Sequence, residues 1–352
     1  MDGLDDRAEA ALESLVEQLY ASEVVQVSHS SRDAVILRLA SVLKNSAAAV
    51  TPPVPNDGGG QGEAAGDNSG GTARGGGGGV PAVVTRKLVF RSGLSVSGAN
   101  ALREALEENG RNLANLDELE FCSLPNVEAL EGALRCAALD FPRIRRLTLI
   151  GLEPGRLRLR VDHGAIATAI SSLLLAPNST LESLVIIDYP LHSVGAGIIA
   201  DAMSKNTTLR VLGLQNCGLQ SDSAPDLARL IRNNRGLEEL DLSHNRRLYL
   251  GSAITREMSV KTIVRRGLLH NTDLVELHMR ALVGGGPSPV NRSKIDLHLD
   301  INRFRKLYVR EGRSPFDIPP ALWPYALARV APKPAVLHMF LQESVAALFP
   351  FI

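Results

Sequence analysis

One stretch decides the fold of this chain: Asn206-Thr-Thr-Leu209-Arg-Val-Leu212-Gly-Leu214-Gln-Asn-Cys217-Gly-Leu219. Its spacing is L-x-x-L-x-L-x-x-C-x-L, which places Leu212 and Leu214 on the same side of a short strand. Cys217 lies where the chain has to turn, and its small side chain fits a tight bend. The same register returns 28 residues later at Leu237, Leu240, Leu242 and Asn245. A repeated register of this kind predicts a solenoid with one strand in each repeat.

The strand pattern recurs along most of the chain. The first predicted strand covers residues 85–90, and later strands begin at Leu116, Ile144, Leu181, Leu209, Leu237 and Leu274, at intervals of 28, 37, 28, 28 and 37 residues. The two longer intervals are the 28-residue unit plus nine, and their additional residues, 153–162 and 246–256, predict loops along one rim. A last strand is predicted over 294–302. We therefore expect eight parallel strands between residues 85 and 302.

Asparagine precedes four of these strands at the same offset, at positions 178, 206, 234 and 271. Because asparagine tolerates the left-handed conformation that ends many helices, these residues predict the point where a helix releases the chain into the next strand. A helix of about three turns, such as 195–205, then fits inside each 28-residue unit.

This long repeat, with one helix per unit and this leucine pattern, resembles the ribonuclease-inhibitor type of leucine-rich repeat over about residues 81–305. The same type includes the GTPase-activating proteins of Ran and the sensor halves of nucleotide-binding immune receptors. The resemblance implies an α/β horseshoe with parallel strands on the concave face and helices on the convex face. It also implies a protein-binding scaffold. No catalytic residue of the Ran activators is carried over to a position of this chain.

Composition divides the chain into four parts. Residues 1–50 predict two amphipathic helices, at 4–20 and from about Ser31, that either cover the first repeat or form a dimerisation or docking arm. Residues 51–80 are rich in glycine and proline and predict a flexible linker. The repeat domain, 81–305, precedes residues 306–352, which predict helices that cap the last repeat or recruit a second partner. This tail is similar to the tails of uncharacterised leucine-rich-repeat proteins from microalgae.

Charge and cysteine usage narrow the function classes. The 352 residues carry a formal net charge of zero, so the chain as a whole is not attracted to nucleic acid or anionic membranes. It has no run of 18 apolar residues that would span a membrane. The three cysteines have no paired spacing, which favours a reducing compartment, the cytoplasm or the nucleus.

The binding surface follows from the alternation of side chains along each strand. The outward positions of the early strands, among them Lys87, Val89 and Glu120, predict a surface of mixed charge. Those of the later strands predict an apolar centre and a carboxylate-rich end. The residues expected to contact a partner are Val185, Ile187, Val211, Gln215, Glu239, Asp241, Glu276, His278, Asp296 and His298. This set favours a protein partner with a basic segment beside an apolar anchor. The sequence leaves the identity of the partner and the oligomeric state open.

Catalytic and metal-binding functions are less well supported. The chain contains no H-E-x-x-H, G-x-S-x-G or paired C-x-x-C motif, so we predict a non-enzyme without a cofactor. His278 and His298 beside Asp241 are possible zinc ligands, but side chains of neighbouring parallel strands stand side by side, and no metal site is predicted. The arginines of residues 143–160 lack interleaved aromatic residues, which argues against nucleic acid. The function expected is a scaffold or adaptor; the alternatives are a regulator of a small GTPase and a substrate-receptor subunit of a ubiquitin ligase.

Overall fold

The structure is a computed structural model. It describes residues 18, 21–27, 85–91, 94–109, 113, 115–124, 126–139, 143–151, 162–249, 264, 266–279, 295–296, 298–300, 302–303 and 306. The predicted linker at 51–80 and the C-terminal helices predicted after residue 306 lie outside the described residues, as does the predicted loop at 153–162 except for Asp162. The predicted helix from about Ser31 lies outside them as well.

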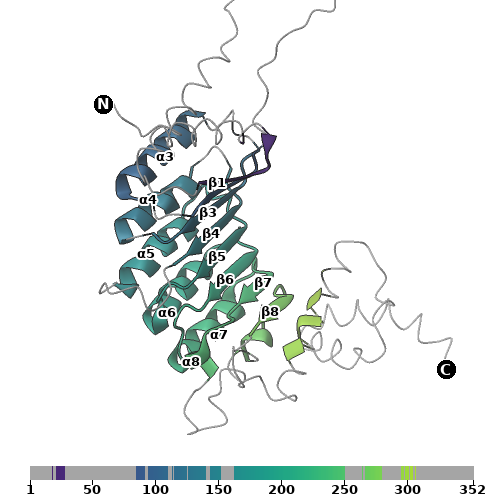
Figure 1. Ribbon diagram of the computed structural model, residues 1–352. Helices are drawn as coiled ribbons and strands as arrows, with labels where there is room; N and C mark the ends of the chain where they lie inside the picture. The colour runs from purple at the N-terminus through teal and green to yellow at the C-terminus, as the bar shows by residue number, and fades with distance from the viewer. Residues whose placement is uncertain are drawn as a thin grey trace, which may run out of the picture.

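The described residues contain one open sheet of eight parallel strands that follow one another in chain order (Figure 1). The strands are β1 (Val24–Val27), β2 (Lys87–Phe90), β3 (Glu118–Cys122), β4 (Arg146–Ile150), β5 (Ser183–Ile187), β6 (Val211–Gln215), β7 (Glu239–Asp241) and β8 (Glu276–His278). This confirms the solenoid that the repeated leucine register predicts.

The helices form a second layer on one side of the sheet (Figure 1). They are α3 (Val96–Asn109), α4 (Val127–Ala137), α5 (His163–Leu174), α6 (His192–Met203), α7 (Ala224–Asn233) and the short α8 (Arg246–Tyr249), with a 3₁₀ turn at Ser221–Ser223. Asn126 begins α4 by accepting a 2.9 Å hydrogen bond from the N–H of Ala129, and Asp162 begins α5 in the same way. The side of the sheet turned away from these helices is called the concave face below.

The core is a ladder of equivalent leucines. In the register of the sheet, Leu212 lies opposite Leu184 on one side and Leu240 on the other. The ladder runs through Leu88, Leu119, Leu147, Leu184, Leu212, Leu240 and Leu277. All but Leu277 are at most 1% exposed. Burial of this column in every repeat holds the strands in one register, because a slip of one residue would turn each leucine to the concave face.

The asparagines act differently from the prediction. None of the four has a left-handed backbone, and Asn234 is extended with φ −73° and ψ 136°. Asn206, Asn234 and Asn271 instead use their buried side chains to bond the backbone of two successive repeats. Left-handed backbones occur where the chain leaves a strand, at Ser123, Asp188, Asn216 and His244.

Two predicted elements are wrong. The first strand of the sheet is β1 within the N-terminal segment, where only helices were expected; Val25 and Val27 are buried against the first repeat. The strand expected over 294–302 is helical in its described residues. Ile295 and Leu299, which lie one helical turn apart, are both buried. In the loop expected over 246–256, residues 246–249 form α8, and the rest lie outside the described residues.

Candidate functional site

The concave face is built by alternate residues of the strands. In β5, Leu184 and Ile186 are buried, whereas Ser183, Val185 and Ile187 are partly exposed. The same alternation in β4 and β6 leaves Thr148, Ile150, Val211 and Gln215 on this face. The positions assigned to the concave face by the strand period are therefore the ones that reach solvent in the middle of the sheet.

Charged side chains at the N-terminal end of this face neutralise one another. Lys87 Nζ lies 2.5 Å from Glu118 Oε1 and 2.8 Å from Glu120 Oε2, and Arg146 Nε lies 3.2 Å from Glu118 Oε2. Burial by itself lowers the pKa of Lys87, but its hydrogen bonds to the two carboxylates outweigh this and raise the pKa above its usual value. Val89 and Glu120 are only 1% and 8% exposed, whereas the side chains of Arg91 and Arg146 stay 50% and 48% exposed, so the expected mixed-charge surface is closed only in part.

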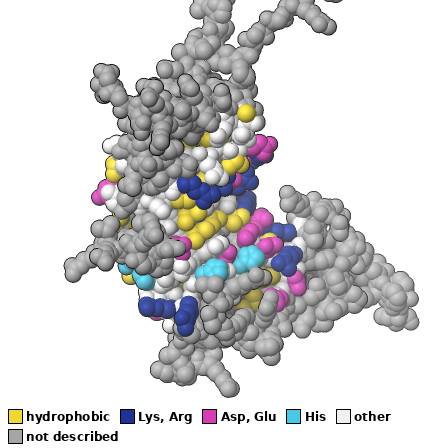
Figure 2. Space-filling model, viewed as in Figure 1, with side chains coloured by type: hydrophobic (Ala, Val, Ile, Leu, Met, Phe, Trp, Pro, Cys, Tyr) yellow, Lys and Arg dark blue, Asp and Glu magenta, His cyan; other side chains and the backbone are white. Residues whose placement is uncertain are grey.

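Apolar side chains occupy the centre. Val185, Ile187 and Val211 are partly exposed on neighbouring strands, and Figure 2 shows hydrophobic side chains gathered there between a basic group and an acidic group with histidines. Gly213 lies buried beneath Val185 in the middle: a Cβ built on it would lie 3.0 Å from Cγ1 of Val185. An apolar centre of partly exposed residues is a surface that a partner can bury at little desolvation cost.

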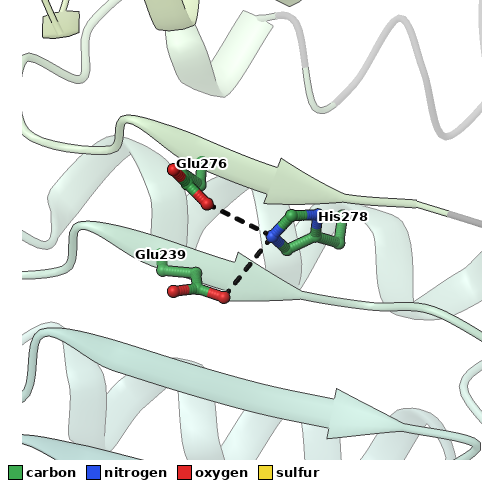
Figure 3. Close-up of side chains that lie close together, drawn as sticks. All are labelled: Glu239, Glu276 and His278. Atoms are coloured by element: carbon green, nitrogen blue, oxygen red, sulfur yellow. Dashed lines mark ion pairs between the residues drawn. The ribbon is translucent and has the colours of Figure 1, made fainter.

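Carboxylates gather at β7 and β8. Glu239 and Glu276 are register partners, and both lie beside the imidazole of His278 (Figure 3). Asp241 is held in place by Gln215, whose Nε2 donates a 2.7 Å hydrogen bond to Oδ2, and by the N–H of Ser243, which donates to Oδ1 at 2.8 Å. Among the described residues, Glu239 and Glu276 pair with His278 and with no lysine or arginine. This end of the face is therefore anionic.

Two curated relatives match part of the repeat domain. The ribonuclease inhibitor of Mus musculus is 29% identical over 178 residues, which are 49% of this chain and 35% of that protein. The ribonuclease inhibitor of Sus scrofa is 40% identical over 75 residues, which are 21% of this chain and 16% of that protein. The matches thus span about a third or less of the length of these relatives. No protein-family model matches the chain.

The repeat spacing, the parallel sheet in chain order and these relatives agree with one another. The fold of this chain is a leucine-rich-repeat solenoid, and its sequence is similar to that of ribonuclease inhibitors.

Solved structures similar to this leucine-rich-repeat protein include leiomodin-1 actin-binding site 2 and the tropomodulin C-terminal domain of Caenorhabditis elegans. The leiomodin-1 chain is 15% identical with a TM-score of 0.41, and the match covers 53% of this chain and 96% of that one. The tropomodulin domain is 17% identical with a TM-score of 0.39, and the match covers 53% of this chain and 99% of that one.

The leucine-rich-repeat sheet brings eight of the ten predicted site residues onto one face, from Val185 in β5 to His278 in β8. Asp296 and His298 lie in the helical segment that replaces the expected last strand, so they do not continue the column of β8. Sequence reasoning missed Gly213. It can be recognised in the sequence because it lies between Leu212 and Leu214, at an outward position. Both neighbouring strands have a side chain at the equivalent position.

Two of the arginines considered for nucleic acid, Arg145 and Arg146, have carboxylate partners. Arg145 Nη1 lies 3.6 Å from Glu182, and Arg146 also lies 3.1 Å from Asp117. Among the described residues of this leucine-rich-repeat protein, no helix is long and apolar enough to cross a membrane.

Proposed function

We propose that this chain is a non-catalytic scaffold whose concave face binds a protein partner, with an apolar side chain over the centre of the face and a basic segment over β7 and β8. The repeat type supports this reading, since the two curated relatives are by name inhibitors of another protein. The observation that carries the proposal is the juxtaposition of the partly exposed centre, Val185, Ile187 and Val211, with the anionic end.

The two ends of the face differ in what they offer a partner. Glu118 and Glu120 already hold Lys87, so a partner would have to break existing ion pairs to use them. Glu239 and Glu276 have only an imidazole beside them among the described residues, and both are more than a third exposed. A basic segment would therefore gain its electrostatic attraction at β7 and β8, and this attraction weakens as salt rises.

The proposed compartment is the cytoplasm or the nucleus. Cys122, Cys136 and Cys217 are all free thiols, and all three are buried. Burial raises the pKa of Cys136 to about 12, which keeps the thiol protonated and unreactive. A chain that keeps three unpaired thiols suits a reducing environment.

A charge-reversal experiment tests the proposal. Full-length chain is used to isolate a partner from native cells, and that partner is then measured against Glu239→Lys with Glu276→Lys. The matched control is Glu107→Lys with Glu128→Lys, which changes net charge equally on exposed sites of α3 and α4, on the opposite side of the sheet. We expect the partner to bind the wild type and the control, and to lose both affinity and salt dependence with the β7–β8 variant.

Unchanged binding and salt dependence in the β7–β8 variant would move the site to the convex helices or the C-terminal region. A partner that is a small GTPase, with faster GTP hydrolysis on addition of the chain, would favour the regulator over the passive scaffold.

A further inference from the structure

Three potential metal ligands converge at the anionic end of the concave face. Nε2 of His278 lies 3.4 Å from Oε1 of Glu239 and 3.5 Å from Oε2 of Glu276 (Figure 3). One donor atom from each residue lies within 4.8 Å of the other two. The three side chains come from two neighbouring parallel strands, Glu239 from β7 and Glu276 and His278 from β8.

The sheet itself produces this convergence. Glu239 and Glu276 face each other across β7 and β8, and His278 lies two residues after Glu276, on the same face of the same strand. Figure 3 shows the imidazole turned back along β8, so that Nε2 points between the two carboxylates. Two strands therefore supply the ligands, and the hydrogen bonds of the ladder fix the spacing of their backbones.

The distances suit a small divalent ion. Ligand atoms bound to zinc at about 2.0–2.1 Å in a tetrahedral shell lie about 3.3–3.4 Å from one another. The two separations from Nε2 are already near that value. Glutamate side chains are long enough to bring the third separation into range by rotation about their own bonds.

The kind of ligand selects the kind of ion. Magnesium and calcium prefer sites made entirely of oxygen, whereas an imidazole together with carboxylates suits zinc and its neighbours among the transition metals. Two carboxylates held this close repel each other, and a dication would relieve that repulsion. Asp241 adds negative charge nearby; hydrogen bonds from Gln215 and Ser243 hold its carboxylate, and it is not one of the three convergent residues.

We propose that Glu239, Glu276 and His278 form a three-ligand surface site for a divalent transition-metal ion of the zinc class. The three side chains leave a fourth ligand position for water. The site links β7 to β8 and lies within the anionic end of the face, so an occupied site would reduce the negative charge there. This inference does not depend on the identity, or the existence, of a protein partner.

The test is a titration of the full chain, stripped of metal by a chelator, with zinc chloride followed by calorimetry. The decisive variant is His278→Ala, which keeps both carboxylates. The matched control is His270→Ala, which removes another exposed histidine from the end of a helix outside the cluster. Cobalt(II) is titrated in parallel, because its visible absorption reports the number and geometry of its ligands.

We expect the wild type and His270→Ala to bind zinc alike, and His278→Ala to lose one zinc equivalent or to bind it at least about tenfold more weakly. Glu276→Gln, which keeps the size of the side chain, should show the same loss, and calcium should not compete. The cobalt absorption of the wild type should disappear in His278→Ala. Identical zinc and cobalt titrations for the wild type, His278→Ala and Glu276→Gln would overturn the proposal, whatever the outcome of the partner experiment.

Discussion

Nδ2 of Asn234 donates a 3.0 Å hydrogen bond to the backbone carbonyl oxygen of Asn206, the equivalent residue one repeat earlier. A second bond, of 2.5 Å, joins Nδ2 to the carbonyl of Met203, near the end of the preceding helix. Oδ1 of the same side chain accepts from the N–H groups of Gly236 and Leu237. Asn271 in turn donates to the carbonyl of Asn234, so the asparagines form a ladder parallel to the leucine ladder.

We predict that Asn234→Ala lowers the free energy of unfolding by at least about 2 kcal/mol, because it leaves several buried backbone groups without a partner. Urea unfolding monitored by circular dichroism measures this loss. Asn233→Ala, the neighbouring exposed residue at the end of α7, should change stability by about 0.5 kcal/mol or less. Equal losses of unfolding free energy from both substitutions would show that the asparagine ladder does not stabilise the fold.

Leu212→Ala should cost about 2–5 kcal/mol, because its side chain is completely buried between Leu184 and Leu240. Leu240→Ala should cost a similar amount. The control is Leu175→Ala, at the end of α5, where the side chain is 44% exposed and the loss should be about 1 kcal/mol or less. A loss of under about 1 kcal/mol for Leu212→Ala would contradict the leucine ladder as the core of the fold.

Strand β1 provides a pair of neighbouring residues with opposite environments. Val25 is 0% exposed and pairs with Leu88, while Val24 is 48% exposed. Val25→Asp should therefore cost more than about 3 kcal/mol, since it buries a carboxylate without a partner. Val24→Asp should cost about 1 kcal/mol or less. Thermal unfolding of both variants distinguishes a strand that is part of the core from one that only covers it.

Unlike β1, the glycine-rich segment 51–80 is expected to contribute little to stability. Deleting residues 51–80 should leave the melting temperature nearly unchanged, because it shortens the connection from Val27 to Lys87 without removing large apolar residues. A drop as large as that of Val25→Asp would mean that the segment contributes to the packed structure.

His192 should make stability depend on pH. Burial, together with the nearby ring of His163 at a centroid distance of 4.3 Å, lowers the pKa of His192 below its usual value of 6.5. The unfolded chain therefore takes up this proton more readily, so stability is fully present above about pH 6.5 and falls as the pH drops through that value.

The substitution His192→Asn removes this proton uptake, and asparagine suits the left-handed backbone at this position, where φ is 52°. Urea midpoints measured at about pH 7.5 and about pH 5 should fall further for the wild type than for the variant. The same pH dependence in both proteins would assign the effect to other groups.

The sequence determined the repeat itself. The spacing of Leu209, Leu212 and Leu214 identifies a strand with one buried face, and its return every 28 residues requires neighbouring strands to bury those faces against one another. For the same reason, the alternation predicted Val185, Ile187, Glu239 and Glu276 on the exposed face correctly. These features depend on local periodicity, which a single sequence displays directly.

Strand β1 and the segment after residue 294 could not be assigned in this way. Val24-Val-Gln-Val27 is too short to show a period, and its partner β2 lies some sixty residues away, so only the exposed edge of the sheet decides its conformation. Ile295 and Leu299, both buried, are four residues apart, a spacing that fits one face of a strand and one face of a helix alike, so local periodicity does not decide between the two.

The same distinction between local periodicity and tertiary structure applies to the candidate site. Periodicity places Glu239, Glu276 and His278 on one face, but it does not determine the direction in which a side chain turns once it leaves the strand. The backbone spacing of the parallel ladder and the rotation of the imidazole bring Nε2 within 3.5 Å of both carboxylates. The sequence determined which residues share the face, and the tertiary structure alone decided which of them meet, because side-chain rotamers are set by the neighbours that the fold supplies.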